Sequence, residues 1–253
     1  MPPSTLSRHA IPRVDREPML RAVLFDAGLT LIRSITPASA VALEALADLN
    51  LVVAPESAAS AMRRADHHLT RIWHHGDWWA SEAAVRSLFI GAYQVGLRTL
   101  PGVGADEALV DRLAELIYTK YHDIRHWAPF PDVLPTLDAL RAAGVTMGVV
   151  SDWGHGLETI LLELELADYF AFLVISSRLG IAKPEPGVFE MALGRIGVPP
   201  AHAVYVGDTY LKDVLGARAA GLTPVLLDRS GHGPPADCLA VRELTDLLGL
   251  VGV

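Results

Sequence analysis

Residues 21–30 read RAVLFDAGLT, a short apolar run that ends on a carboxylate at Asp26. Runs of the same kind, rich in valine, occur at Val145–Ser151, Phe172–Ile175, Ala203–Asp208 and Thr223–Leu227. Short apolar runs with β-branched residues are typical of buried strands. The sequence therefore predicts strands at these five places, with the first of them at residues 21–26.

Helical patterns lie between the predicted strands. Apolar residues recur at helical spacing at Leu157, Ile160, Leu161 and Leu164, and again at Phe189, Leu193 and Ile196. Strands that alternate with helices indicate a parallel sheet with right-handed crossovers. We therefore expect an α/β fold whose core is a Rossmann-like parallel sheet.

One long interval breaks this alternation. Between the first two predicted strands the sequence has only helical patterns, at Val41–Leu49, Glu56–Trp73, Ser81–Leu97 and Asp106–Tyr121. This interval is too long for a single crossover, so it predicts an inserted all-helical cap domain. The expected organisation is a mobile leader at residues 1–20, a core at 21–34 and 129–253, and a helical cap at 35–128.

Composition narrows the classes of function. Hydrophobic residues make up 51% of the chain and the net charge is −8, which argues against a general affinity for nucleic acid or anionic membranes. Cys238 is the single cysteine, which excludes an intrachain disulfide and suits a cytoplasmic protein. No apolar run reaches the roughly 18 residues expected of a membrane span.

Polar side chains end three of the predicted strands, at Asp26, Ser151 and Asp208. Ligands in open parallel sheets bind beyond the carboxyl ends of the strands. These three residues are therefore expected to converge at one edge of the sheet, under the cap.

Four segments, in order, resemble the motifs of the haloacid-dehalogenase-like hydrolase superfamily. FDAGLTL at residues 25–31 resembles the first motif, and Ser151 after VTMGVV resembles the second. Lys183 in IAKPEPGVF resembles the third motif, and VGDTYLKD at 206–213 resembles the fourth. The resemblance covers residues 21 to about 228, and the helical insert is similar to the family's type 1 cap.

The resemblance implies a Mg2+ site. Asp26 and Asp208 would ligate the ion, and the backbone carbonyl of Gly28 would be a further ligand. Asp213 would support the ion from the same turn as Asp208 or orient a water bound to the metal. Carboxylate and carbonyl oxygens are the ligands that Mg2+ prefers.

The resemblance also implies catalytic and substrate-binding roles. Asp26 would be the nucleophile that forms an aspartyl-phosphate. Thr30 and Ser151 would donate hydrogen bonds to the phosphoryl oxygens. Lys183 would pair with Asp26 and with the phosphoryl group, stabilising charge that develops there.

Each residue alone has a plainer interpretation. Asp26 and Ser151 could cap helices, and a lysine before a proline, as at Lys183, is usually a solvated surface residue. Asp213 could act only on the dipole of its own helix. These interpretations do not explain why all four groups are expected at one end of one sheet.

Gly28 departs from the family pattern. Phosphatases of this family usually carry a second Asp there, which protonates the leaving oxygen and then activates water, and a Gly where this chain has Leu29. General acid–base help is worth about 10^2–10^4-fold. We therefore expect an intact metal and phosphate site with slowed hydrolysis, unless another group supplies the proton.

The cap offers candidates for that proton donor. Histidines occur at His67, His68, His74 and His75, near Trp73, Trp78 and Trp79. A histidine can titrate near neutral pH. The alternative is that these side chains belong to the surface and the core of the cap, and no three-ligand zinc spacing is present among them.

Three functions remain open. The leading hypothesis is a Mg2+-dependent phosphatase of small organic phosphates. A dehalogenase-type C–X hydrolase also uses an Asp nucleophile without the second Asp, but it needs no metal. A non-catalytic protein that binds phosphate for regulation would fit Gly28 as well. The substrate and the oligomeric state are not defined by the sequence.

Overall fold

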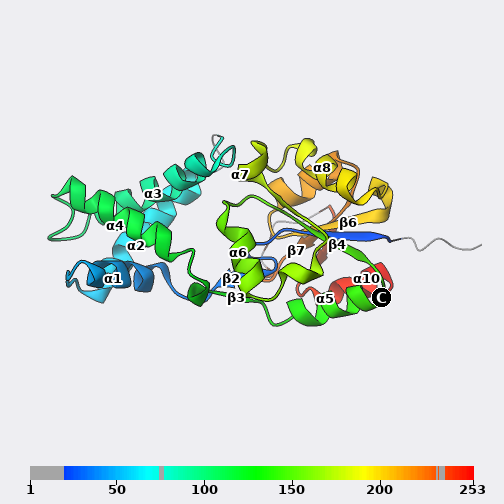
Figure 1. Cartoon of the computed structure of the whole chain (residues 1–253), viewed down its shortest axis with the longest axis horizontal. Coiled ribbons are helices and arrows are strands. Elements are labelled where there is room, and N and C mark those ends of the chain that lie inside the picture. The colour runs from blue at the N-terminus through cyan, green and yellow to red at the C-terminus, as the bar shows by residue number, and fades with distance from the viewer. Residues whose placement is uncertain (1–19, 74–76, 232, 234–236) are drawn as a thin grey trace, which may run out of the picture.

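The computed structural model describes residues 20–73, 77–231, 233 and 237–253. Its core is a six-stranded sheet in the order β5-β4-β1-β6-β7-β8, with all neighbours parallel (Figure 1). The strands are β1 (Ala22–Phe25), β4 (Thr146–Ser151), β5 (Leu173–Ile175), β6 (Ala203–Gly207), β7 (Thr223–Leu227) and β8 (Leu239–Val241). The α/β fold and the five expected strands are confirmed, while the edge strand β8 was not expected.

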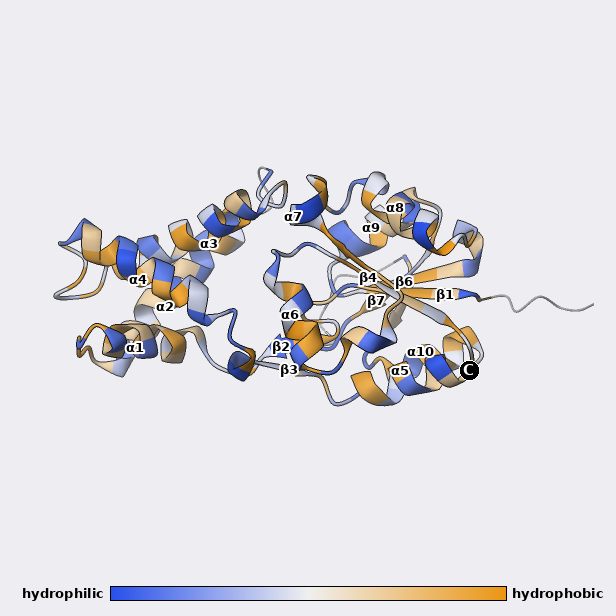
Figure 2. Cartoon of the chain, viewed as in Figure 1, coloured by the Kyte–Doolittle hydropathy of each residue, from blue (hydrophilic) through white to orange (hydrophobic). Residues whose placement is uncertain are grey.

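The sheet is buried because its central strand sends apolar side chains to both faces. In β1, Val23 and Phe25 enter the core on one face, and Ala22 and Leu24 enter the core on the other. This is the period of two that a strand imposes. The strands are accordingly among the most apolar segments of the chain (Figure 2).

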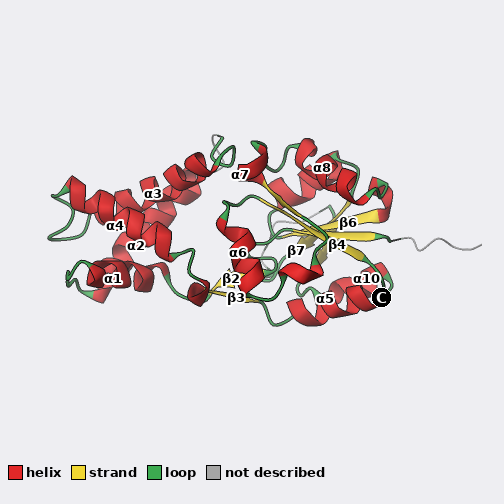
Figure 3. Cartoon of the chain, viewed as in Figure 1, coloured by secondary structure: helices red, strands yellow, loops and turns green. Residues whose placement is uncertain are grey.

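Helices cover both faces. The side reached by Val23 and Phe25 is packed by α5 (Val133–Ala142), α6 (Gly156–Glu163) and α10 (Thr245–Val251). The other side is packed mainly by α8 (Pro186–Ile196) and α9 (Leu215–Ala219), next to the short α7 (Ser176–Leu179). The result is three layers with the sheet in the middle (Figure 3).

A helical cap follows β1. Its helices are α1 (Ala38–Asp48), α2 (Pro55–Ile72), α3 (Glu82–Leu97) and α4 (Glu107–Lys120). Ser81 and Asp106 begin α3 and α4, where their side chains accept hydrogen bonds from Ala84 N–H and Leu109 N–H. The four helices share a core of their own, which includes Leu46, Leu97 and Leu113. The expected insert is therefore helical and separately packed.

The two segments that connect the core to the cap form strands that pair with each other. Strands β2 (Ile32–Ser34) and β3 (Trp127–Pro129) form an antiparallel two-stranded ribbon. The expectation of helix alone up to residue 128 was wrong at Trp127 and Ala128, because these residues pair with Ser34 and Arg33. We propose that the core, at 21–34 and 129–253, and the cap, at 35–128, divide at this ribbon.

The predicted leader at residues 1–20 lies, except for Leu20, outside the described residues. No helix in the described ranges is both long enough and apolar enough to cross a membrane.

Candidate active site

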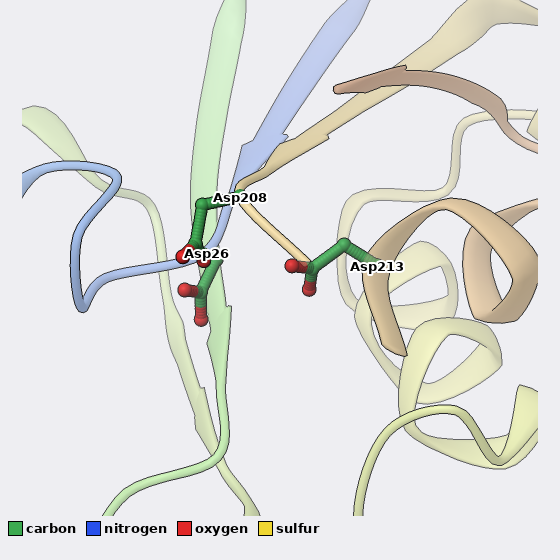
Figure 4. Close-up of side chains that lie close together, drawn as sticks. All are labelled: Asp26, Asp208 and Asp213. Atoms are coloured by element: carbon green, nitrogen blue, oxygen red, sulfur yellow. The ribbon is translucent and has the colours of Figure 1, made fainter. Parts of the chain in front are cut away.

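The carboxyl ends of three adjacent strands bring the predicted polar residues together. Asp26 follows β1, Ser151 ends β4 and Asp208 follows β6, and β1 is paired with both β4 and β6. Lys183 enters from the loop between α7 and α8, and Asp213 comes from the π-helical turn Tyr210–Val214. Figure 4 shows Asp26 and Asp208 side by side, with Asp213 approaching from that turn.

Lys183 is the cation of this cluster. Its Nζ donates hydrogen bonds to Asp26 Oδ1 at 2.8 Å, to Asp213 Oδ1 at 2.6 Å and to the Tyr205 hydroxyl at 3.1 Å. Burial alone would lower the pKa of Lys183, but the Asp213 and Asp26 carboxylates hold it well above its usual range. The side chain is therefore a fixed positive charge rather than a proton donor.

Asp213 is held within the protein by both of its oxygens. Oδ1 accepts from Lys183 and from the Tyr205 hydroxyl, and Oδ2 accepts from Thr209 N–H at 2.8 Å. The carboxyl comes this close because residue 207 is glycine: a Cβ there would lie 2.3 Å from Asp213 Cγ. Asp213 is thus placed to orient Lys183 and the turn after β6.

Asp26 has one engaged oxygen and one open oxygen. Oδ1 accepts from Ser151 Oγ at 2.9 Å and from Lys183, while no described residue donates a hydrogen bond to Oδ2. Burial and the nearby charge of Asp213 raise the pKa of Asp26 against the opposing effect of Lys183. The open oxygen is the one that could attack an electrophile or bind a cation.

The cluster carries more negative than positive charge. Carboxylate oxygens of Asp26, Asp208 and Asp213 lie within 4.8 Å of one another, and Lys183 is the cation that contacts two of them. Burial and the charges of Asp26 and Asp213 raise the pKa of Asp208 to about 7. A divalent cation would relieve this repulsion, and the all-oxygen donor set fits Mg2+.

The turn after Asp26 contains a residue in the left-handed conformation. Leu29, not Gly28, adopts the left-handed conformation, with φ of 57° and a side chain that is 59% exposed. Gly28 instead leaves room for an indole, because a Cβ at Gly28 would lie 2.7 Å from Trp153 Cζ3. An aromatic ring therefore occupies the space into which the family's second Asp would project.

Thr30 does not line the cavity into which Asp26, Ser151 and Lys183 open. Its side chain is fully buried, and Oγ1 has no hydrogen-bond partner among the described residues. Its carbonyl accepts a hydrogen bond from Arg229, which also pairs with Asp132 and so fixes the turn. This geometry gives no support to the predicted contact between Thr30 and a phosphoryl group.

Two further charged residues were missed by the sequence analysis. The carboxylate of Asp152 accepts the backbone N–H of Lys183 at 3.0 Å and pairs with Lys212 Nζ at 2.9 Å. Lys212 in turn lies 4.8 Å and 5.1 Å from the ring centroids of Trp73 and Trp79 in the cap. Asp152 thereby positions the lysine loop, and Lys212 joins the core to the cap.

The cluster opens into a cavity of about 460 Å3 between core and cap. Asp26, Lys183 and Asp208 lie at its core end, and its cap end is lined largely by aromatic side chains. Among the described lining residues, His122 is the histidine. His67 and His68 do not line the cavity, and His74 and His75 lie outside the described residues.

Comparison with known proteins agrees with the fold and the motifs. The chain matches the family model described as haloacid dehalogenase-like hydrolase over residues 20–221. It is 41% identical over 124 residues to haloacid dehalogenase-like hydrolase domain-containing protein 3 of Danio rerio, covering 49% of this chain and 51% of that protein. It is 38% identical over 134 residues to glyceraldehyde 3-phosphate phosphatase of Methanopyrus kandleri, covering 51% and 56%.

These alignments span about half the length of the curated relatives. The structure resembles that of 2-haloacid dehalogenase from Pseudomonas syringae pv. Tomato DC3000 over nearly its whole length, with 29% identity, a TM-score of 0.61, and 92% and 99% of the two chains covered. The family match covers most of the chain, and the four motifs meet at one cavity. The chain belongs to the haloacid dehalogenase-like hydrolases.

Proposed function

We propose that the chain is a Mg2+-dependent phosphatase of small organic phosphates that works through an aspartyl-phosphate on Asp26. The observation that carries this proposal is the charge imbalance at the core end of the cavity. Three carboxylates lie together, and one buried lysine contacts two of them, which suits a site for a divalent cation and a phosphoryl group.

The residues suggest how the first step would run. Oδ2 of Asp26 forms a bond to phosphorus while the ester P–O bond breaks, and the leaving oxygen keeps the electron pair and takes a proton from water. Lys183 is placed to stabilise the negative charge near Asp26 Oδ1, and Ser151 holds the carboxylate in orientation. Mg2+, when bound by Asp26 and Asp208, would supply positive charge opposite the phosphoryl oxygens.

The second step returns the enzyme to its starting state. The oxygen of a water molecule bonds to phosphorus, the bond to Asp26 breaks, and the proton of the water is released to solvent. Gly28 offers no side chain to accept that proton. We therefore expect this step to be slow compared with phosphatases that carry the second Asp.

A phosphate-release screen over small phosphate esters, with and without Mg2+, tests the proposal. Release that depends on Mg2+ and is lost in Asp26→Asn supports it. Trapping radioactive phosphate from a labelled ester on wild type, but not on Asp26→Asn, would identify the covalent intermediate.

Two further measurements, of halide release and of ligand binding, separate the two alternatives. A C–X hydrolase would release halide from 2-haloacids without metal, and the similarity to a 2-haloacid dehalogenase makes that assay necessary. A non-catalytic protein would bind Mg2+ and phosphate without turnover. The single cysteine, Cys238, and the net charge of −8 support placing this activity in the cytoplasm, away from nucleic acid and membranes.

A further inference from the structure

A continuous aromatic wall runs from the cap to the reaction centre. Consecutive ring centroids along it are 6.4, 6.5, 6.3, 6.5 and 5.1 Å apart, in the order Trp79, Phe89, Tyr93, Tyr121, Trp127 and Trp153. All six side chains line the cavity that contains Asp26 and Lys183. These separations are typical of aromatic side chains in contact, so the wall is one packed surface.

The last ring of the wall, Trp153, packs against the turn that follows Asp26, the predicted nucleophile. Trp153 Cζ3 lies 2.7 Å from the position of a Cβ on Gly28, and Gly28 is two residues from Asp26. The part of a substrate next to the scissile oxygen therefore lies beside an indole, where the family pattern has a carboxylate.

The polar groups of the cap side are few. Among the described lining residues, Asp66 is the charged side chain that the cap adds, and it is exposed. The Tyr118 hydroxyl already donates to Glu82, and His122 Nδ1 already lies 2.9 Å from the Tyr118 carbonyl oxygen. Beyond these, the cap side offers chiefly the hydroxyls of Tyr93 and Tyr121 and the indole N–H of Trp79. Most hydroxyls of a buried sugar would therefore lose hydrogen bonds to water without regaining them, which costs free energy for each one.

We infer that the substrate is a phosphate monoester of an aromatic alcohol, with its ring held against the aromatic wall; this inference rests on the proposed function. The volume of about 460 Å3 is within the range that holds a small aromatic molecule with its phosphate. An additional negative charge on the ring is disfavoured by Asp66, so the ring of the ester is expected to carry no charged substituent.

An aryl leaving group suits a site in which Gly28 replaces the acid that would protonate the leaving oxygen. Asp26 Oδ2 gains the bond to phosphorus, and the bond between phosphorus and the aryl oxygen breaks with its electron pair on that oxygen. The product is a phenolate, which water protonates. Phenols are far stronger acids than alkyl alcohols, with a pKa of about 10 for the tyrosine side chain, so the leaving oxygen needs little help from a protein acid.

Affinity for non-hydrolysable analogues tests the inference without relying on turnover. In the presence of Mg2+, calorimetry would compare methylphosphonate with 2-naphthylmethylphosphonate on the whole chain. The naphthyl compound is expected to bind about tenfold tighter or more, since its rings bury apolar surface on the wall. Equal affinities would overturn the inference, whether or not the chain hydrolyses phosphate esters.

Variants test which side chains produce the tighter binding of the naphthyl compound. Trp153→Leu and, in the cap, Phe89→Leu should lose most of it while methylphosphonate binds as before. Trp78→Leu is the matched control, because Trp78 belongs to the cap cluster and does not line the cavity. A preference that survives both Trp153→Leu and Phe89→Leu would also contradict the inference.

Turnover separates this inference from the proposed function. Phenyl and 2-naphthyl phosphate have leaving groups of similar acidity, so a lower KM for the naphthyl ester reports contact with the wall. Sugar phosphates that are hydrolysed as efficiently as aryl phosphates would overturn the inference and leave the phosphatase in place. Tight binding of the naphthyl phosphonate without phosphate release from any ester would overturn the phosphatase and leave the aromatic preference in place.

Discussion

Lys183 and Asp213 form a buried ion pair in which Nζ lies 2.6 Å from Oδ1. Tyr205 supports it from the middle of β6: its hydroxyl lies 3.1 Å from both charged groups and 2.9 Å from the Val150 carbonyl oxygen. The pair is therefore anchored to two strands of the sheet. This arrangement keeps the ammonium in contact with Asp26 before any substrate arrives.

Replacing Lys183 with alanine should reduce phosphate release by about 100-fold, the loss typical of removing one preorganised charge-stabilising group. It should also lower the free energy of unfolding by about 3–5 kcal/mol, since the carboxylates lose their buried partner. Steady-state kinetics and thermal unfolding in Mg2+ would measure both effects. Lys183→Met retains the apolar stem and serves as the second variant, and full turnover by either folded protein would show that Lys183 is not catalytic.

Replacing Asp208 with asparagine should have opposite effects on the free and the metal-loaded protein. The variant removes a carboxylate whose pKa is raised to about 7 by burial and by its charged neighbours. The metal-free variant should therefore be at least as stable as wild type near neutral pH, but its stabilisation by Mg2+ should be lost. Thermal unfolding in EDTA measures the stability of the metal-free protein, and thermal unfolding in Mg2+ measures the stabilisation by the metal.

The pH dependence of metal-free stability follows from the same carboxyl. Because the folded pKa lies above the ordinary value of 3.8, the folded protein binds more protons than the unfolded chain between about pH 4 and 7. This contribution to stability is full below that range and is lost as the pH rises through it. Asp208→Asn should flatten the curve, whereas Asp168→Asn, at an exposed carboxylate, should not.

Much of the fold was predictable because its signals are local. The strands at Ala22–Phe25 and Ala203–Gly207 are apolar runs bounded by polar residues, and two of the cap helices have polar N-caps, Ser81 and Asp106. Strands β2, β3 and β8 were missed because each has three residues, too few to establish a period of two. Strand β5 is equally short, but Phe172 lengthens its apolar run to four residues.

The site was only partly predictable, because much of it depends on contacts between distant segments. Asp26 and Asp208 follow strands, so their convergence could be expected from parallel topology. Tyr205 looks like an ordinary strand residue, and Asp152 like a helix cap, until Lys183 is placed beside them. Trp153 gave no signal at all, since its role depends on the absent Cβ of a residue 125 positions earlier in the chain.

Replacing Leu29 with glycine should stabilise the protein. Leu29 has φ of 57°, a conformation that costs a residue with a Cβ about 1–2 kcal/mol, and its side chain is 59% exposed, so little packing is lost. The extra entropy of glycine in the unfolded chain offsets part of the gain. A net gain of about 1 kcal/mol should raise Tm by roughly 2–4 °C for a chain of this size.

Asn50 provides the matched control for that measurement. It has the same φ of 57°, but asparagine tolerates the left-handed conformation, so Asn50→Gly should gain less. An equal gain at both positions would mean that the strain at Leu29 is no greater than that at Asn50. A loss of stability at Leu29→Gly would show that the leucine side chain makes a contact that outweighs its strain.

The last prediction restores the missing acid at Gly28. If its absence limits hydrolysis, the wild-type rate should fall steeply as the pKa of the leaving group rises, and an Asp there should help alkyl phosphates more than activated ones, by at most about 10^2–10^4-fold. Gly28→Asp alone should fail to do this, because its Cβ would lie 2.7 Å from Trp153 Cζ3 and must displace the ring, at a cost of about 1–3 kcal/mol.

Gly28→Asp with Trp153→Ala makes room for the carboxylate, so the double variant should show the gain on alkyl phosphates that neither single variant shows. A rate series over phosphate esters of graded leaving-group acidity, with Tm and Mg2+ affinity of every variant, measures this directly. One outcome would contradict this prediction. If wild type hydrolyses alkyl and aryl phosphates at similar rates and His122→Asn, at the histidine that lines the cavity, removes the alkyl activity, then the cap supplies the proton and Gly28 is no handicap.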